Sequence, residues 1–116
     1  MEFPDTATGL VLGKWKAAGF DLRKELKVEF FAAAPDEENG KRIAELATRS
    51  GFGASVEFTE FTVGGVRKGR WTCYCTKILI PTYQTIVEHE QAVDEIARQF
   101  GGYGDGFGSF GNLPRN

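Results

Sequence analysis

The residues at 101–111, GGYGDGFGSFG, decide the fold, because they form either a nucleotide-binding loop or the last strand of a sheet. Six of these eleven positions are glycine, and Gly106, Gly108 and Gly111 match the spacing G-x-G-x-x-G. In a dinucleotide-binding fold, that spacing lies between a strand and the start of a helix, whose amides hold the pyrophosphate. Here the glycines follow a predicted helix instead, and no Gly-Lys-Ser/Thr of a P-loop occurs in the chain. We therefore interpret the segment as a strand.

Alternation along this strand predicts two very different faces. One face carries Tyr103, Asp105, Phe107 and Ser109, and the other carries Gly104, Gly106, Gly108 and Phe110. Glycine inside a strand often marks the close approach of another element. We interpret the glycine-rich face as packed beneath a helix, and a flat shelf for a partner is the alternative.

Apolar periodicity upstream predicts the rest of the core. Strands are predicted at 26–34, 52–61 and 70–80, helices at 36–50 and 82–100, and the final strand at 103–110. The Asn39-Gly40 pair is typical of a tight turn, but the helical spacing after it favours a continuous helix. This order over residues 26–110 is βαββαβ, which predicts an α+β ferredoxin-like plait with a four-stranded antiparallel sheet in the order 4-1-3-2.

The N-terminal part adds one further element to this core. Leu10, Trp15 and their neighbours repeat at helical spacing and predict a helix over 6–19, after a loose terminus at 1–5. The 116 residues then form a single domain.

Composition narrows the classes of function. The formal net charge of −2 disfavours direct binding of nucleic acid by charge alone. No apolar run is long enough to cross a bilayer, and the first residues lack the features of a secretory signal, so we expect a cytoplasmic protein that does not bind a membrane.

Catalytic and metal-binding chemistry has little support in the sequence. His89 is the only histidine, and Cys73 and Cys75 are the only cysteines, which we expect to be free, buried thiols. The carboxylates cluster on predicted helix faces that contact solvent. We predict a protein that is not an enzyme and that has no catalytic residues, no cofactor and no metal site.

The face of the sheet opposite the predicted helices carries two aromatic rings on its central strands, Phe31 and Tyr74. Arg70, Thr72, Thr76 and Lys27 share this face by alternation. Such rings can stack the bases of single-stranded RNA. Coverage by the N-terminal helix, or a protein interface, is the interpretation that we favour, because a sheet rarely leaves large rings in water.

Three segments, VEFFAAAPDEE at 28–38, WTCYCTKILIP at 71–81 and GGYGDGFG at 101–108, occur in this order on the predicted topology. Together they resemble the bacterial RNase E inhibitor family, the RraB-like regulators of ribonuclease E activity, over roughly residues 20–110. The positions that match the family pattern are Trp71, Lys77, Pro81, Gly101, Gly102, Asp105 and Gly106. The chain departs from it at Gly104, where the family has tyrosine, and at Phe107, where it has tryptophan.

The resemblance implies a non-catalytic regulatory protein that binds an RNase E-type endoribonuclease and lowers its activity, thereby altering RNA decay. We predict Phe31, Tyr74, Asp105 and Phe107 as the partner-binding residues, on the final strand and the aromatic face of the sheet. The alternative function is a single-stranded RNA-binding module that uses the same aromatic face.

Overall fold

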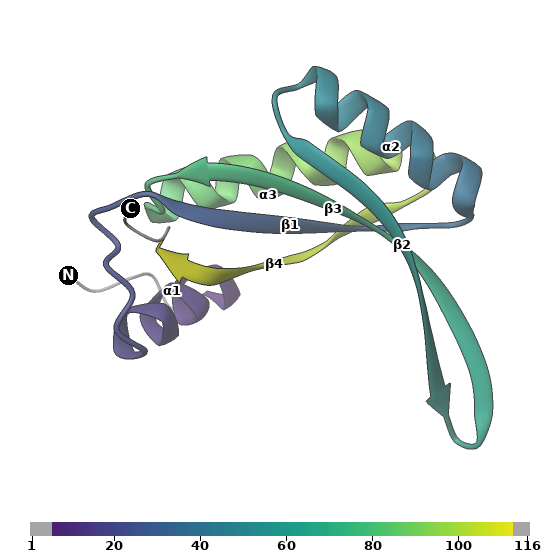
Figure 1. Ribbon diagram of the computed structural model, residues 1–116, viewed down its shortest axis with the longest axis horizontal. Helices are drawn as coiled ribbons and strands as arrows, with labels where there is room; N and C mark the ends of the chain where they lie inside the picture. The colour runs from purple at the N-terminus through teal and green to yellow at the C-terminus, as the bar shows by residue number, and fades with distance from the viewer. Residues whose placement is uncertain (1–5, 113–116) are drawn as a thin grey trace.

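The computed structural model describes residues 6–112, with side chains described as far as Ser109, and it is an α+β structure with a four-stranded antiparallel sheet. The loose terminus expected at 1–5 lies outside the described residues. In chain order the elements are α1 (Ala7–Ala17), β1 (Leu26–Ala34), α2 (Glu37–Arg49), β2 (Gly53–Val63), β3 (Val66–Leu79), α3 (Tyr83–Arg98) and β4 (Tyr103–Asn112), as Figure 1 shows.

The strand order is β2-β3-β1-β4, which reads 4-1-3-2 from the β4 edge. Both neighbours of β1 are antiparallel to it, and Phe31 lies opposite Tyr74 in the register. Strands β1 and β3 are therefore central, as the sequence predicts. None of the three described helices has the length and apolar character needed to span a bilayer.

All three helices begin at residues whose side chains cap them, and the Thr6 hydroxyl accepts a hydrogen bond of 3.2 Å from the Gly9 amide at the start of α1. The Asp36 carboxylate accepts a hydrogen bond of 2.8 Å from the Asn39 amide, and the Thr82 hydroxyl accepts one of 3.1 Å from Thr85. The Asn39-Gly40 pair lies inside α2, as predicted from the spacing. A Cβ at Gly40 would lie 3.0 Å from Val56 on β2, so glycine allows this helix to approach the sheet.

The core lies between the sheet and the helices, and Phe30 is fully buried within it. Cys73 and Cys75 point into the same core as free thiols, with their sulfurs 3.8 Å apart, as the sequence predicts. The adjacent Cys73 sulfur and burial both raise the pKa of Cys75. Cys75 is therefore a neutral thiol.

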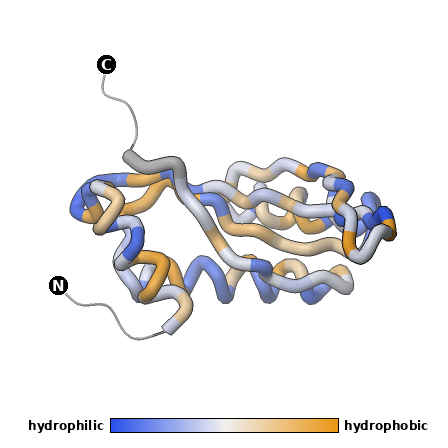
Figure 2. Tube along the Cα trace, turned by 90° about the horizontal axis from the view of Figure 1, so that it is seen from below, coloured by the Kyte–Doolittle hydropathy of each residue, from blue (hydrophilic) through white to orange (hydrophobic). Residues whose placement is uncertain are grey.

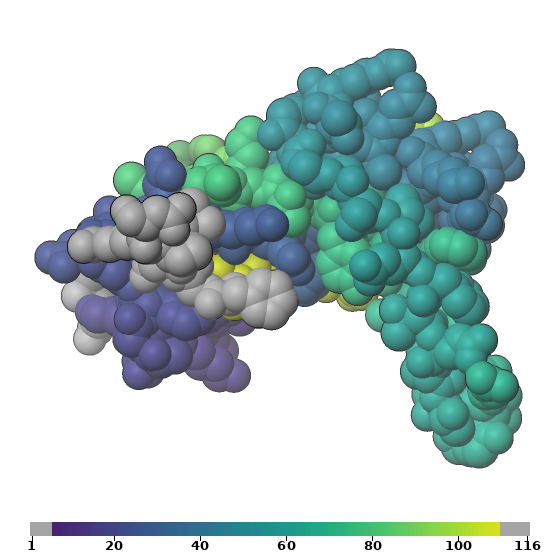
Figure 3. Space-filling model, in the orientation of Figure 1, coloured from purple at the N-terminus to yellow at the C-terminus, as the bar shows by residue number. Residues whose placement is uncertain are grey.

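The hairpin of β2 and β3 is longer than predicted, because its ladder continues to a two-residue turn at Gly64-Gly65. Both glycines have positive φ, 56° and 78°, which suits a turn that only glycine and a few other residues adopt easily. Residues 57–70, here called the arm, are all exposed. The arm projects away from the rest of the molecule (Figures 1 and 3). The sequence did not predict the full length of the arm, because charged residues and Gly69 interrupt the apolar alternation that marks a strand.

Strand β4 contains a bulge that corrects the predicted alternation. Gly104 lies opposite Ala32, but Phe107 lies opposite Phe30, so β4 has one more residue than β1 in this interval. Gly106 has φ of 98°, a conformation that suits glycine at a bulge. The extra residue places Asp105 and Phe107 on opposite faces of the sheet, so the prediction that they share a face was wrong.

Helix α1 extends the helical layer and leaves the aromatic face uncovered. The Trp15 ring meets Phe107 edge to face, with centroids 5.3 Å apart, and the Thr8 hydroxyl donates to Glu90 of α3 at 2.8 Å. Seen from below, α1 lies on the same side of the sheet as α3 (Figure 2). The expected coverage of Phe31 and Tyr74 by this helix is therefore not what the structure shows.

Replacement of Gly106 by alanine tests the bulge. We expect Gly106→Ala to lower the free energy of unfolding by about 1–2 kcal/mol, because a Cβ disfavours positive φ. Gly108→Ala on the same strand is the control, since its Cβ would make only an ordinary contact with Phe31 at 3.5 Å. Urea unfolding of the two variants measures the difference, and equal stabilities would contradict a structural role for the Gly106 conformation.

Candidate binding surface

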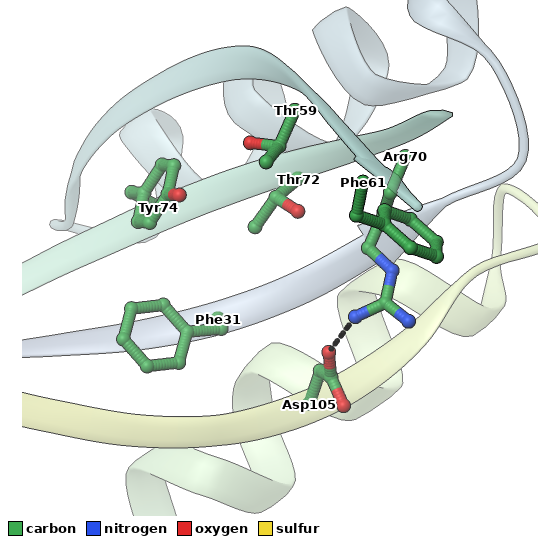
Figure 4. A pocket seen from close by; sticks show the side chains of 7 residues that line it. All are labelled: Phe31, Thr59, Phe61, Arg70, Thr72, Tyr74 and Asp105. Atoms are coloured by element: carbon green, nitrogen blue, oxygen red, sulfur yellow. Dashed lines mark hydrogen bonds and ion pairs between the residues drawn. The ribbon is translucent and has the colours of Figure 1, made fainter. Parts of the chain in front are cut away.

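The open face of the sheet carries an aromatic hollow at the base of the arm. Phe31 of β1 and Tyr74 of β3 meet edge to face, with ring centroids 5.5 Å apart and planes at 87°. The hollow has a volume of about 410 Å³ and is lined by Phe31, Thr59, Phe61, Arg70, Thr72, Tyr74 and Asp105. These side chains belong to β1, β2, β3 and β4, and Figure 4 shows how they lie around the hollow. The structure thus brings together Phe31, Tyr74 and Asp105 of the predicted site.

Arg70 links the arm to the opposite edge of the sheet. Its guanidinium Nη1 donates to the Asp105 carboxylate at 3.1 Å, and its charged group lies 5.7 Å from the centre of the Phe61 ring (Figure 4). Both partners of this ion pair are more than one third exposed, so we expect it to contribute at most about 1 kcal/mol to stability. Its main effect is to hold Arg70 across the hollow.

Phe107, the fourth predicted residue, lies on the other side of the sheet. Its ring contacts Trp15 of α1 and lies 6.2 Å from Phe30. The bulge at Gly106 causes this, because its extra residue turns the Phe107 side chain to the face opposite that of Asp105. Phe107 is therefore a packing residue between the sheet and α1.

Phe61 and Thr59 also line the hollow, although neither was predicted from the sequence. Thr59 lies opposite Arg70 and Phe61 lies opposite Lys68, so both share the face of Tyr74. The sequence could have predicted both residues, because a two-residue turn at Gly64-Gly65 fixes the register of β2 against β3 and so places Thr59 and Phe61 on the face of Tyr74.

Beyond Tyr74 the open face becomes polar and carries both signs of charge. A second hollow of about 420 Å³ is lined by Lys27, Glu29, Gly53, Ala54, Ser55, Glu57, Tyr74 and Thr76. Together with Arg70 and Asp105, the face has cations and carboxylates in similar number. It therefore lacks the positive surplus that a phosphate backbone requires.

Chemistry that would make or break bonds is not visible on this surface. His89 lies on the helix side, where its Nδ1 is 2.7 Å from the Thr85 carbonyl and its ring stacks on Phe30 at 5.6 Å. Within residues 6–112, no group of three or more His, Cys, Asp or Glu side chains is arranged to hold a metal ion. The arrangement suits recognition of another molecule.

Asp94 of α3 anchors the strand that carries Asp105. Its carboxylate accepts hydrogen bonds from Arg98 Nε at 2.7 Å and from the Gly104 amide at 2.8 Å. The Arg98 hydrogen bond and then the Gly104 amide lower the pKa of Asp94 below its ordinary value of 3.8. A Cβ at Gly104 would lie 3.1 Å from the Asp94 Cβ, so the prediction that a helix packs on a glycine of this strand is confirmed at Gly104.

Comparison with known proteins gives one match over nearly the whole chain. The family model described as RraB, regulator of ribonuclease activity B, matches residues 5–109. The curated proteins give no match. Among solved structures, the chain is similar to the Bacillus subtilis YXEP protein, described as a dinuclear metal binding peptidase from the M20 family, with 16% identity and a TM-score of 0.41. That likeness covers 78% of this chain and 26% of the peptidase, so the chain spans about a quarter of its length.

Truncation of two phenylalanines distinguishes the packing side of the sheet from the open side. We expect Phe107→Ala to lower the free energy of unfolding by about 2–3 kcal/mol, because it removes a ring that contacts Trp15 and Phe30. Phe31→Ala should lower the free energy of unfolding by only about 1 kcal/mol, since the Phe31 ring borders the open hollow. Denaturant titration of both variants measures this, and a larger cost at Phe31 would contradict the placement of the two rings.

The lowered pKa of Asp94 predicts a pH dependence with a definite sign. A depressed pKa in the folded state adds stability above the unfolded pKa, and this stability is lost as the pH falls through the folded pKa. We therefore expect the stability difference between the native chain and Asp94→Asn to shrink as the pH falls below about 4. Urea unfolding across this range measures it, with Glu45→Gln on the exposed side of α2 as the control. A difference that grows on acidification would contradict the ionised contact.

Proposed function

We propose, because the chain belongs to the family of regulator of ribonuclease activity B proteins, that it binds an RNase E-type endoribonuclease directly and lowers its activity. The chain catalyses no reaction in this proposal and acts by association alone. An RNase E-type partner would place this interaction in the bacterial cytoplasm, where it would slow RNA decay. The observation that carries the proposal is the aromatic hollow on the open face, which α1 leaves uncovered.

The residues of the hollow have the composition of a protein-binding surface. Tyrosine, phenylalanine and arginine are enriched where proteins meet, and residues that dominate binding energy are often Tyr and Arg. Here Phe31 and Tyr74 line one end of the hollow, Phe61 and Arg70 line the other, and Thr59 and Thr72 add hydroxyl groups to the lining (Figure 4). The surface is preformed, since the rings already contact each other and Arg70 is held by Asp105.

The charges of the surface favour a protein over a nucleic acid. The cations Lys27, Lys68 and Arg70 are matched by three carboxylates on the same face, those of Glu29, Glu57 and Asp105. The whole chain carries a formal net charge of −2. A partner with charges of both signs fits this face better than a polyanion.

We also propose that the fold is a ferredoxin-like plait. Strand order 4-1-3-2, with the order βαββαβ after α1, supports a ferredoxin-like plait to which α1 is added. In this arrangement the helices stabilise one face of the sheet and leave the other for a partner.

A second candidate function is the binding of single-stranded RNA. The observation that favours it is the position of Phe31 and Tyr74 opposite each other on the two central strands, where bases can stack. Base stacking on an aromatic side chain contributes about 1–3 kcal/mol per base.

Replacement of Tyr74 tests both functions in one set of assays. We expect Tyr74→Ala to weaken binding to the purified RNase E-type endoribonuclease of the source organism by about tenfold or more, because it removes a central ring of the interface. Inhibition of RNA cleavage should weaken in parallel. The control is Glu45→Ala on the exposed side of α2, far from the hollow.

Each outcome of these assays has a separate meaning. A native chain that neither binds nor inhibits the enzyme would contradict the proposed function. If the Tyr74→Ala variant inhibits the enzyme as strongly as the native chain does, the interface lies elsewhere on the molecule. If the native chain binds a single-stranded oligonucleotide and Tyr74→Ala does not, the RNA-binding function is supported instead.

A further inference from the structure

The arm, residues 57–70, continues the sheet into solvent without support from the rest of the chain. Its ladder stays in register to the turn, yet every one of its residues is exposed. Phe61, Val63 and Val66 share one face of it and are 36%, 54% and 57% exposed. A two-stranded ribbon is only marginally stable in water, and a gathered set of exposed apolar side chains marks an interaction surface. The arm therefore has the properties of an element that another chain completes.

One side of the arm is a strand edge with vacant hydrogen-bonding positions. Strand β1 pairs with β3 only from Trp71 to Leu79, so among the described residues no strand lies beside Val66–Arg70 on that side. We call Val66–Arg70 the open edge. In an antiparallel ladder, successive residues direct their N–H and C=O groups alternately to the two neighbouring strands. Since Val63 and Val66 close a two-residue turn on each other, Arg67 and Gly69 direct theirs away from β2.

The open edge leads directly into the aromatic hollow. A strand added beside it would lie in line with β1, and the last residue of the open edge, Arg70, is one of the residues that line the hollow (Figure 4). Lys68 lies opposite Phe61 on the same face. A strand added at this edge would therefore place every second side chain beside Lys68 and Arg70, on the face of the sheet that carries the hollow.

We propose that the open edge binds an extended segment of the partner protein as an additional strand. This inference rests on the proposed function and names the part of the partner that is recognised. Main-chain hydrogen bonds from Arg67 and Gly69 hold the segment, and the hollow selects its alternate side chains. Arg67 is paired with the Glu60 carboxylate, whereas Lys68 lies on the same face as Phe61. The segment therefore has an acidic residue near Lys68 and a long apolar residue that reaches over the strand toward Phe61.

A second copy of this chain does not fit the same edge. An antiparallel pairing of Val66–Arg70 with its own copy sets one cation opposite another, for example Lys68 opposite Lys68 when the segment is centred on itself. Like charges directly opposite each other destabilise a strand pair. The charges of the edge thus select against self-association and in favour of a different protein.

A proline at Arg67 tests the strand addition, because it removes the outward N–H and leaves the pairs with β2 intact. The matched variant Arg67→Ala loses the same charge and keeps the N–H. We expect Arg67→Pro to bind the purified RNase E-type endoribonuclease about tenfold more weakly than Arg67→Ala, the loss that follows when a main-chain hydrogen bond and its neighbours are disrupted. Circular dichroism melting of both variants verifies that the body of the fold is retained.

Hydrogen exchange of the native chain provides a measurement that does not depend on a variant. In the complex with the endoribonuclease, the amides of Arg67 and Gly69 should be protected, whereas each exchanges readily in the unbound chain. Equal binding by the two Arg67 variants together with unprotected amides would overturn the strand addition and leave the proposed function standing. A native chain without affinity for the enzyme would overturn both. Binding to a single-stranded oligonucleotide or to vesicles of phosphatidylglycerol and phosphatidylcholine, with no binding to the enzyme, would also overturn them.

Discussion

Two adjacent rings on β1 point in opposite directions, and the structure depends on this constraint. Phe30 is fully buried, and its ring lies near those of Phe52, His89 and Phe107, so it joins β1 to α3 and β4. Successive side chains of a strand alternate between its faces. Phe31 must therefore lie on the open face, where it meets Tyr74. The packing that fixes the core also fixes a ring of the candidate binding surface.

The same alternation explains how much of the site could be predicted from the sequence. Phe31 is an apolar residue on the polar side of its strand, and this irregularity is visible in the order of the residues alone. Tyr74 was predicted as a site residue because it lies on the second central strand, and Asp105 because it lies on the final strand. The structure places all three side chains at one hollow of the open face.

The features that could not be predicted depend on backbone conformation at glycine. Strand β4 has glycine at three of the five positions from 104 to 108, and any of them could have held an extra residue of a bulge. Only the register against β1 shows that the bulge lies beside Gly106, which moves Phe107 into the core. The length of the arm was hidden for a similar reason. Gly69 interrupts the alternation of β3, and a Cβ there would overlap the Phe58 ring.

Because the arm contributes so little to the core, its sequence can change at small cost to folding. Substitutions at Val63, Val66 or Lys68 leave the buried residues of the body untouched, since these positions are exposed and lie beyond the end of β1. Under the proposed strand addition, a family built on this plan diverges in partner specificity while its scaffold stays the same. Evolution can then retarget such a regulator through a few residues of one hairpin, without first acquiring extra stability elsewhere.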